Sequence, residues 1–321
     1  MKKQLVLLTL LLASVAGFAQ QDAQFSQWMF NKMDLNPAFT GTDKSICGTA
    51  IYRNQWVGFA GAPTTVMASV GGYFPIVHGG LGLTVFNDKL GFSNTFIAQA
   101  SYSYHLSLQG GASTLGIGVD AGLFQQSVNG TWNSTDPSQL DPSIPASGTK
   151  VTTYDLGLGL YYTTGTGMFF GLSSTHLPEN TINSSNIQTN YNNTTQNSKL
   201  SYELARHYYF MAGIPFTLSA TYKLVPSILA KSDGASTTFD IDARMVWQNK
   251  VWFGLGYRLS DAVIAMVGMQ WGTALIGYSY DFTTSNIRNY SSGSHEIVLR
   301  YCMKPYKEPA PTEWSNPRYF Y

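Results

Sequence analysis

The sequence predicts an all-β protein, a transmembrane antiparallel β-barrel, and three observations support this prediction. Charged residues make up 12% of the 321 residues, about half the share that is usual in soluble domains. Aromatic residues reach 14%, yet the chain has no run of about 18 apolar residues that would form a membrane-spanning helix. From about residue 44 onward, apolar and polar residues alternate with a period of two, which is the pattern of strands with one face in lipid.

The first residues have the pattern of a secretory signal peptide. Lys2 and Lys3 precede an apolar run from Leu5 to about Ala16, and a Gly-Phe-Ala sequence supplies small residues for cleavage. We expect cleavage after Ala19, so that residues 1–19 are removed. A membrane anchor fits less well, because the apolar run is too short to span a bilayer. The mature protein is therefore expected outside the cytoplasm, where disulfides persist.

Residues 20–43 are expected to form an N-terminal segment that is not part of the barrel wall. Four apolar residues recur there at helical spacing, namely Phe25, Trp28, Met29 and Met33. Asn36 and Pro37 then end the pattern. The sequence thus predicts a short helical segment that plugs the lumen or lies at the periplasmic mouth.

Residues 44–303 are predicted to form the barrel, with about fourteen strands of roughly 8–14 residues. The strands are expected to begin near residues 44, 63, 79, 92, 112, 151, 167, 207, 217, 236, 250, 261, 273 and 293. In the strand near 236, Phe239 and Ile241 alternate with Asp242, so the first two should face lipid and the third the lumen. An even strand count places both ends of the barrel on the periplasmic side.

The lengths of the connections agree with this arrangement. Every second connection is short, at 75–78, 107–111, 163–166, 215–216, 248–249 and 271–272. The two longest connections, 129–150 and 173–206, belong to the other set and are rich in Asn, Ser, Thr and Pro. Outer-membrane barrels have short periplasmic turns and longer outer loops. We therefore expect 129–150 and 173–206 to lie outside the cell and to offer a contact surface.

A soluble β-sandwich would show the same alternation and is the main alternative. It does not explain why Tyr and Trp gather near the expected strand ends, where membranes favour aromatic belts. These residues are Tyr52, Trp56, Tyr102, Tyr104, Tyr161, Tyr162, Trp247, Tyr257 and Trp271. Residues 304–321 contain four prolines and are expected to form a periplasmic tail rather than a strand.

The sequence offers little for catalysis. The five histidines are spread over different strands and loops, and His295 with Glu296 lacks the second histidine of a zinc-protease helix. The glycines around Ile117 open no helix, so they do not form a phosphate-binding loop and are expected to let the wall curve. The net charge of +1 does not suggest a nucleic-acid partner. We expect no enzyme, no metal site and no cofactor.

Inward-facing charged residues form the clearest polar set in the predicted barrel. They are Arg53, Asp120, Asp155, Asp240, Asp242, Arg244, Arg258, Asp281, Glu296 and Arg300. In a water-filled pore they would line a channel. In a plugged lumen they would form a salt-bridged network, which is the interpretation that we favour.

Two cysteines lie at the ends of the expected barrel. Cys47 is in the first strand and Cys302 in the last, and barrel closure makes these strands neighbours. Both side chains should face inward near the periplasmic end. A disulfide across this seam is a hypothesis that requires a Cα separation below about 7 Å. Two free buried thiols are the alternative.

Three stretches of the chain resemble the PorP/SprF family. They are QWMFNKMDLNPAFTG at 27–41, YRNQWVGFAGAPTT at 52–65, and GYSYDF at 277–282 with GSHEI at 293–297. The resemblance implies an outer-membrane protein of the type IX secretion system of Bacteroidetes. It also implies a link to the export and surface attachment of large proteins, including gliding-motility adhesins, whose C-terminal domains carry the secretion signal. The proline-rich tail is longer than the family pattern.

We therefore expect a barrel in outer-membrane lipid that captures the C-terminal domain of a secreted cargo protein, with periplasmic secretion-system components as further partners. The segment after the first strand offers hydrogen-bond donors and aromatic groups that are favoured in binding sites. Its candidate partner-binding residues are Arg53, Asn54, Gln55, Trp56, Phe59 and Pro63. A tight hairpin without a partner is the alternative for this segment. A pore for passive or substrate-specific small-molecule transport is the alternative function.

Overall fold

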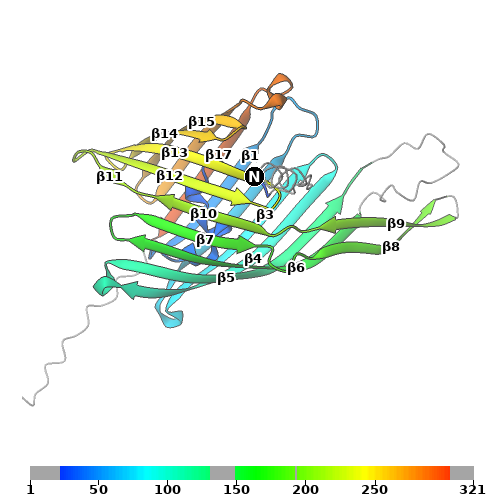
Figure 1. Ribbon diagram of the computed structural model, residues 1–321, viewed down its shortest axis with the longest axis horizontal. Coiled ribbons are helices and arrows are strands. Elements are labelled where there is room, and N and C mark those ends of the chain that lie inside the picture. The colour runs from blue at the N-terminus through cyan, green and yellow to red at the C-terminus, as the bar shows by residue number, and fades with distance from the viewer. Residues whose placement is uncertain (1–21, 131–148, 192–193, 304–321) are drawn as a thin grey trace, which may run out of the picture.

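The computed structural model describes residues 22–130, 149–191 and 194–303. Within them, fourteen antiparallel strands form a closed barrel, as the sequence predicts (Figure 1). The strands are β1 (Ile46–Asn54), β2 (Thr64–Phe74), β3 (Gly79–Leu90), β4 (Ser93–Leu108), β5 (Ser113–Val128), β6 (Thr149–Thr164), β7 (Phe169–Thr175), β10 (His207–Gly213), β12 (Tyr222–Ser232), β13 (Thr237–Trp247), β14 (Val251–Arg258), β15 (Ala262–Trp271), β16 (Ala274–Thr283) and β17 (Ser294–Met303). Among the described residues, no helix has the length and apolar character needed to cross a membrane.

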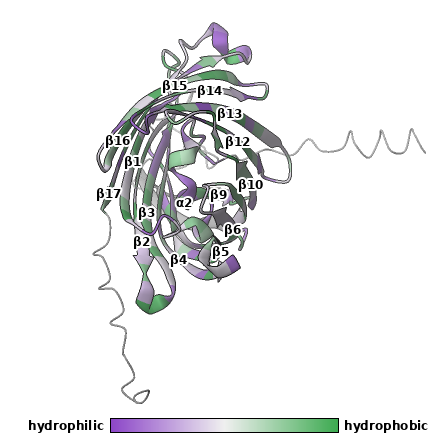
Figure 2. Cartoon of the chain, turned by 90° about the vertical axis from the view of Figure 1, so that its left-hand side faces the viewer, coloured by the Kyte–Doolittle hydropathy of each residue, from purple (hydrophilic) through white to green (hydrophobic). Residues whose placement is uncertain are grey.

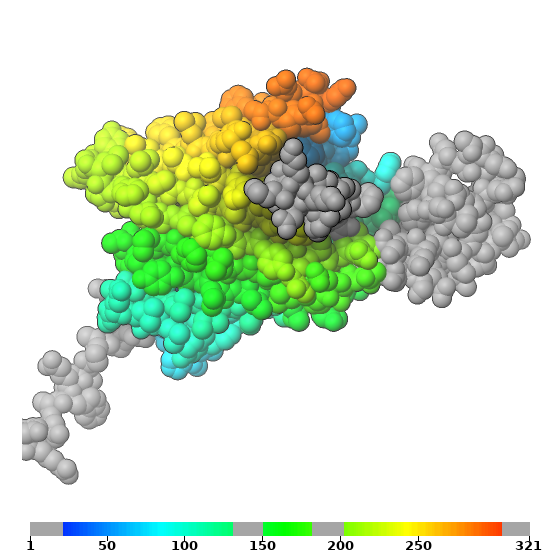
Figure 3. Space-filling model, in the orientation of Figure 1, coloured from blue at the N-terminus to red at the C-terminus, as the bar shows by residue number. Residues whose placement is uncertain are grey.

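Each wall strand pairs with its neighbours along the chain, and two pairings complete the circle. β1 pairs with β17, and β10 joins β7 to β12. The green and yellow parts of the chain therefore meet in one continuous surface (Figure 3). A short strand, β11 (Phe216–Thr217), extends the edge of β12, and the 3-10 turns η3 (Pro75–Val77), η4 (Gln109–Gly111) and η5 (Asn286–Asn289) lie in connections.

One long connection contains strands of its own. β8 (Thr181–Tyr191) and β9 (Thr194–Glu203) pair only with each other among the described residues and project beyond one end of the barrel (Figure 1). The sequence predicts only a long outer connection over 173–206, rich in Asn, Ser, Thr and Pro, and does not predict these two strands. Most of the other long connection, 131–148, lies outside the described residues. We call the end of the barrel that carries the β8–β9 hairpin the outer end.

The two faces of the wall differ in polarity as predicted. In β13, Phe239 and Ile241 are 38% and 56% exposed on the outside, whereas Asp240 and Asp242 are buried on the inside. Figure 2 shows the resulting mixture of hydrophobic and hydrophilic residues along the strands. Because side chains of a strand point alternately to opposite faces, this pattern separates a lipid-facing surface from a polar lumen.

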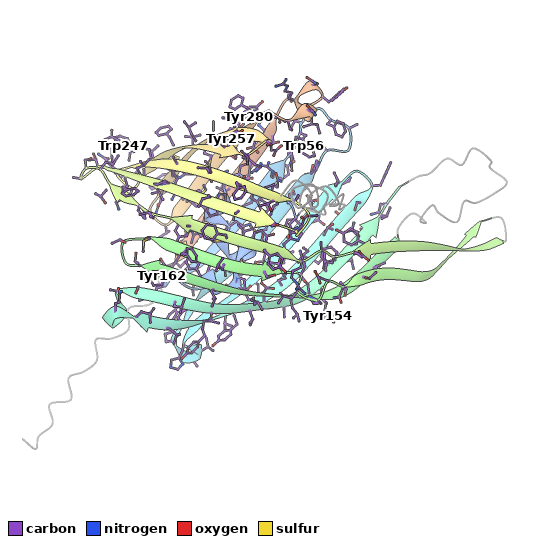
Figure 4. All side chains as sticks on the ribbon, in the orientation of Figure 1. Trp56, Tyr154, Tyr162, Trp247, Tyr257 and Tyr280 are labelled. Atoms are coloured by element: carbon purple, nitrogen blue, oxygen red, sulfur yellow. A yellow bond between two sulfur atoms is a disulfide. The ribbon has the colours of Figure 1, made fainter. Side chains whose placement is uncertain are left out.

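Aromatic residues lie near both ends of the wall (Figure 4). Trp247 and Tyr162 are near the end with short turns, and Trp56, Tyr154, Tyr257 and Tyr280 lie toward the other end. The expectation of aromatic belts was wrong for Tyr161, which is buried in the lumen and packs against Phe39 and Phe169. Its neighbour Tyr162 has the opposite parity and therefore faces outward.

The N-terminal segment, residues 22–43, lies inside the barrel, and we call it the lumen segment. The predicted helical pattern is broken into η1 (Trp28–Phe30), α2 (Lys32–Leu35) and η2 (Pro37–Phe39). Asn31 separates the first two with a non-helical backbone. A continuous amphipathic helix would bury only one of its faces. The barrel wall surrounds the lumen segment, so the side chains of this segment meet wall residues on every side.

Glycines of the wall allow the lumen segment to approach closely. A Cβ atom added to Gly118 in β5 would overlap the backbone of Ala38, and one added to Gly80 in β3 would overlap that of Thr40. The sequence predicted that the glycines near Ile117 let the wall curve. The structure gives these glycines a role that the sequence did not predict, which is close contact between the wall backbone and the backbone of the lumen segment.

The first and last wall strands are joined by a disulfide. Cys47 and Cys302 are partners in the β1–β17 register, their Cα atoms lie 4.0 Å apart, and the two residues form a disulfide. This bond spans the seam at the end of the barrel with short turns, which we call the periplasmic end.

Candidate functional site

A buried network of charges attaches the lumen segment to the wall. The guanidinium group of Arg53 in β1 pairs with the carboxylates of Asp281 at 2.7 Å and Glu296 at 3.0 Å. The same group donates a 2.8 Å hydrogen bond to the hydroxyl of Ser26 in the lumen segment. Arg53 is only 1% exposed, so its charge depends on these partners rather than on water.

Glu296 in β17 binds the backbone of the lumen segment directly. Its two carboxylate oxygens accept hydrogen bonds from the amide groups of Ser26 at 2.8 Å and Gln27 at 2.7 Å. Hydrogen bonds between charged and neutral groups are stronger than those between two neutral groups. The family-like sequences around residues 27, 53 and 296 therefore meet in one network.

A second arginine extends the network across neighbouring strands. Arg258 in β14 pairs with Asp240 at 2.9 Å and with Asp281 and Asp261 at 3.4 Å each. Asp281 thus lies between two arginines. Three acidic residues around one guanidinium group offset its loss of water.

Aromatic contacts hold the middle of the lumen segment. The indole N–H of Trp28 donates to Asp242 at 2.7 Å, and the Arg244 guanidinium lies 4.9 Å from the centre of the Phe30 ring. The Lys32 amino group lies 3.3 Å from the centre of the Phe169 ring. Cation–π contacts gain strength as water is excluded, and both cations are half-buried here.

A third group of polar residues lies at the outer end. His176, which follows β7, pairs with Asp155 at 2.8 Å and with Asp22 at 3.1 Å. Burial disfavours a charge on the imidazole, but the two carboxylates outweigh burial and raise the pKa of His176 to about 10. His207, at the start of β10, stacks edge-on against His176.

The eight residues predicted as a lumen network all belong to the inner face, but they do not form one network. Asp240, Arg258 and Glu296 join Arg53 and Asp281. The others are distributed among separate contacts: Asp242 and Arg244 meet aromatic rings, Asp155 meets His176, Arg300 pairs with Asp43, and Asp120 is buried apart from these pairs. The alternation of residues along each strand predicted that these side chains face the lumen. Which partners they contact depends on the lumen segment.

The predicted partner-binding residues are divided between the interior and the rim. Arg53, Gln55 and Pro63 are buried, whereas Phe59 is 45% exposed and Asn54 and Trp56 are partly exposed. The loop is closed by backbone hydrogen bonds from Gln55 to Pro63 and from Val57 to Gly293. The rim is therefore an ordered hairpin, and its accessible apolar group is Phe59.

Sequence reasoning missed Ser26, Asp22, His176 and His207 as members of polar clusters. Ser26 lies next to the family-like stretch at 27–41, which was a usable signal. The other three are far apart in the sequence, and only the pairing of β7 with β10 and the path of the lumen segment bring them together.

Comparisons with known proteins place the chain in a family. The sequence pattern of the family described as type IX secretion system membrane protein PorP/SprF matches residues 17–301. No curated protein matches the sequence. Among solved structures, the toluene transporter TbuX of Ralstonia pickettii is similar, with 10% identity, a TM-score of 0.48, and coverage of 84% of this chain and 92% of that one.

Two further solved barrels are similar at the same low level of identity. The toluene transporter TodX of Pseudomonas putida has 10% identity and a TM-score of 0.48, and the match covers 90% of this chain and 96% of that one. The outer membrane protein Omp33 of Acinetobacter baumannii has 8% identity and a TM-score of 0.39, with coverage of 81% and 96%.

Proposed function

Because the chain belongs to the PorP/SprF family of type IX secretion system membrane proteins, we propose that it binds a secreted surface protein in the outer membrane and anchors it through that protein's C-terminal domain. In this role it supports secretion or gliding motility and catalyses no reaction. Further partners are periplasmic components of the secretion system.

The observation that carries this proposal is the occupied lumen. The lumen segment is bound to opposite parts of the wall, through Arg53 and Glu296 on one side and through Phe169 and Tyr161 on another. A barrel whose interior is filled in this way is suited to be a rigid platform rather than a wide passage. The segments at the outer end of the barrel would then recognise the cargo protein.

The β8–β9 hairpin is the most prominent of these segments. It projects from the outer end, and the two strands have no third partner strand among the described residues (Figure 1). Unpaired strand edges present N–H and C=O groups to which another chain can add a strand. The hairpin therefore supports a docking role, and the exposed Phe59, in the loop between β1 and β2, offers a separate apolar contact on another part of the outer rim.

Removal of the distal part of the hairpin tests the proposal. Deletion of residues 187–198, with a short Gly-Ser turn in their place, should leave the barrel folded because none of these residues pairs with the wall. Cargo retention at the cell surface, measured by antibody labelling of intact cells and by co-purification, should fall at least tenfold. Phe59→Ala should weaken retention less.

A matched control separates hairpin loss from general damage. Arg288→Ala alters an exposed residue on a different outer connection, η5, and should leave cargo retention unchanged. Unchanged cargo display in the deletion variant would overturn the docking role of the hairpin. If the deletion variant and the intact protein both conduct ions as wide pores, the alternative function of small-molecule transport is favoured.

A further inference from the structure

Two buried histidines and one carboxylate converge at the outer end of the lumen, outside the arginine network. They are Asp22, His176 and His207, and one donor atom from each lies within 4.8 Å of the others. We call them the outer histidine cluster. Both histidines are only 2% exposed, so their arrangement is not that of side chains that meet by chance at a surface.

The histidine rings are held by hydrogen bonds in the manner of metal ligands. Nδ1 of His176 lies 2.8 Å from a carboxylate oxygen of Asp155, and Nδ1 of His207 lies 3.0 Å from the carbonyl oxygen of Ala205. In metal sites, the ring nitrogen that does not bind the metal usually donates to a carboxylate or a backbone carbonyl. Both Nε2 atoms face Asp22: that of His176 lies 3.1 Å from the Asp22 carboxylate, and that of His207 accepts a hydrogen bond from the Asp22 amide at 3.2 Å. A metal ion would therefore displace the proton between His176 and Asp22 and take the place of the hydrogen bond to His207.

We propose that the outer histidine cluster binds Zn²⁺ or a similar divalent transition metal. Two imidazole nitrogens and one carboxylate oxygen suit such ions, whereas Mg²⁺ and Ca²⁺ prefer oxygen ligands alone. Ligand atoms in a tetrahedron with bonds of about 2.0–2.2 Å lie about 3.3 Å apart. The distance from Nε2 of His176 to Oδ1 of Asp22 is already 3.1 Å, whereas the His207 ring must move closer to the other two ligands, since the three ligand atoms lie within 4.8 Å of one another.

The surroundings provide room for an exchangeable fourth ligand. Asp22 and His176 border a cavity of about 90 Å³, which Tyr209 and Asp34 also line. The Tyr209 hydroxyl donates to the second carboxylate oxygen of Asp22 at 2.7 Å and so orients it. Lys231, a nearby positive charge, donates to the backbone carbonyl of Asp22 and not to its carboxylate.

The three ligands come from three separate segments, which gives the site a structural consequence. Asp22 belongs to the lumen segment, His176 follows β7, and His207 begins β10. The last two flank the β8–β9 hairpin at its base. A bound metal would therefore join the lumen segment to the base of the hairpin, so that one ion stabilises both.

The test uses the full mature protein, purified from outer membranes without a histidine tag and treated with a chelator. Isothermal titration with Zn²⁺ should show one ion per barrel, and Mg²⁺ and Ca²⁺ should show no comparable binding. His176→Gln, His207→Gln and Asp22→Asn should each weaken Zn²⁺ binding by at least about tenfold, and Asp155→Asn by about 10–100-fold. Cobalt(II) absorption in the visible range should report nitrogen and oxygen ligands and should change in the same variants.

His78→Gln is the matched control, because His78 is exposed at the short turn after η3, at the opposite end of the barrel. It should leave Zn²⁺ affinity unchanged. Electrophoresis without boiling identifies any variant that does not fold, and Asp22→Asn removes a ligand without altering a wall strand. Absence of Zn²⁺ binding to the intact protein would overturn the proposal and assign the cluster to a proton shared between His176 and its carboxylates. Equal binding by all folded variants would also overturn it.

Discussion

Arg53 shows how much of the interior depends on one side chain. It is buried, it pairs with Asp281 and Glu296, and it contacts Ser26 of the lumen segment. The candidate partner-binding set included Arg53, but its position makes it a link between wall and lumen segment. A guanidinium group is suited to this task because its donors point in several fixed directions and it stays charged when buried.

Replacement of this side chain should therefore be costly. Arg53→Ala leaves two buried carboxylates without their partner, which should lower the free energy of unfolding by about 3–5 kcal/mol. Denaturant unfolding in detergent, followed by tryptophan fluorescence, measures this change. Arg288→Ala removes an exposed arginine and should change the free energy by less than about 0.5 kcal/mol. Equal losses in the two variants would contradict the role assigned to Arg53.

At the scale of elements, the seam between β1 and β17 combines two kinds of closure. Nine residue pairs from Ile46–Met303 to Asn54–His295 form the backbone ladder, and the disulfide lies near one end of it. The ladder alone closes the barrel. The disulfide links residues that are 255 positions apart in the sequence, so it mainly restricts the unfolded chain.

Because the ladder closes the barrel and the disulfide restricts the unfolded chain, loss of the disulfide should lower the stability of the barrel without opening it. The purified protein should show no free thiol before reduction and two thiols after reduction in denaturant, measured by maleimide labelling and mass spectrometry. The double variant Cys47→Ser with Cys302→Ser should still form a barrel, but its free energy of unfolding should be about 2–4 kcal/mol lower than that of the intact protein. Labelling of both thiols without reductant would show that the disulfide is absent from the protein.

At the scale of the whole molecule, the lumen segment occupies the interior of the barrel from one end toward the other. It runs from Asp22 at the outer end to Asp43 near the periplasmic end, and its contacts reach β1, β6, β13 and β17 on the way. The path crosses the full lumen. Flow of solutes through the barrel would therefore require this segment to leave or to move.

Electrical recording in planar bilayers tests this expectation. The intact protein should show little steady conductance, and deletion of residues 22–42 should produce a large and stable one, because the wall closes without the segment. Arg53→Ala should give intermittent openings and serves as a second variant if the deletion fails to assemble. A large conductance of the intact protein, equal to that of the deletion, would support the transport alternative.

The wall of the barrel could be predicted from the sequence because the information is local. Alternation of residues such as Ile241 and Asp242 determines which face of a strand is apolar. A shift of the strand by one residue would expose charged side chains to lipid. The same parity predicts that Cys47 and Cys302 face the same side. Hydrophobic pattern and turn length were therefore sufficient for the fourteen wall strands, their faces and their order around the barrel, but not for the β8–β9 hairpin.

The tertiary structure alone decided what fills this wall and which distant residues meet inside it. The helical spacing of Phe25, Trp28 and Met29 predicted a helix, yet the segment is divided into short turns with a non-helical backbone at Asn31, and Glu296 binds the backbone amides of Ser26 and Gln27 ahead of the first turn. Likewise, no spacing in the sequence brings Asp22 to His176 and His207. Such contacts depend on closure of the circle and on the path of a chain through it, which are properties of the assembled molecule and not of any local pattern.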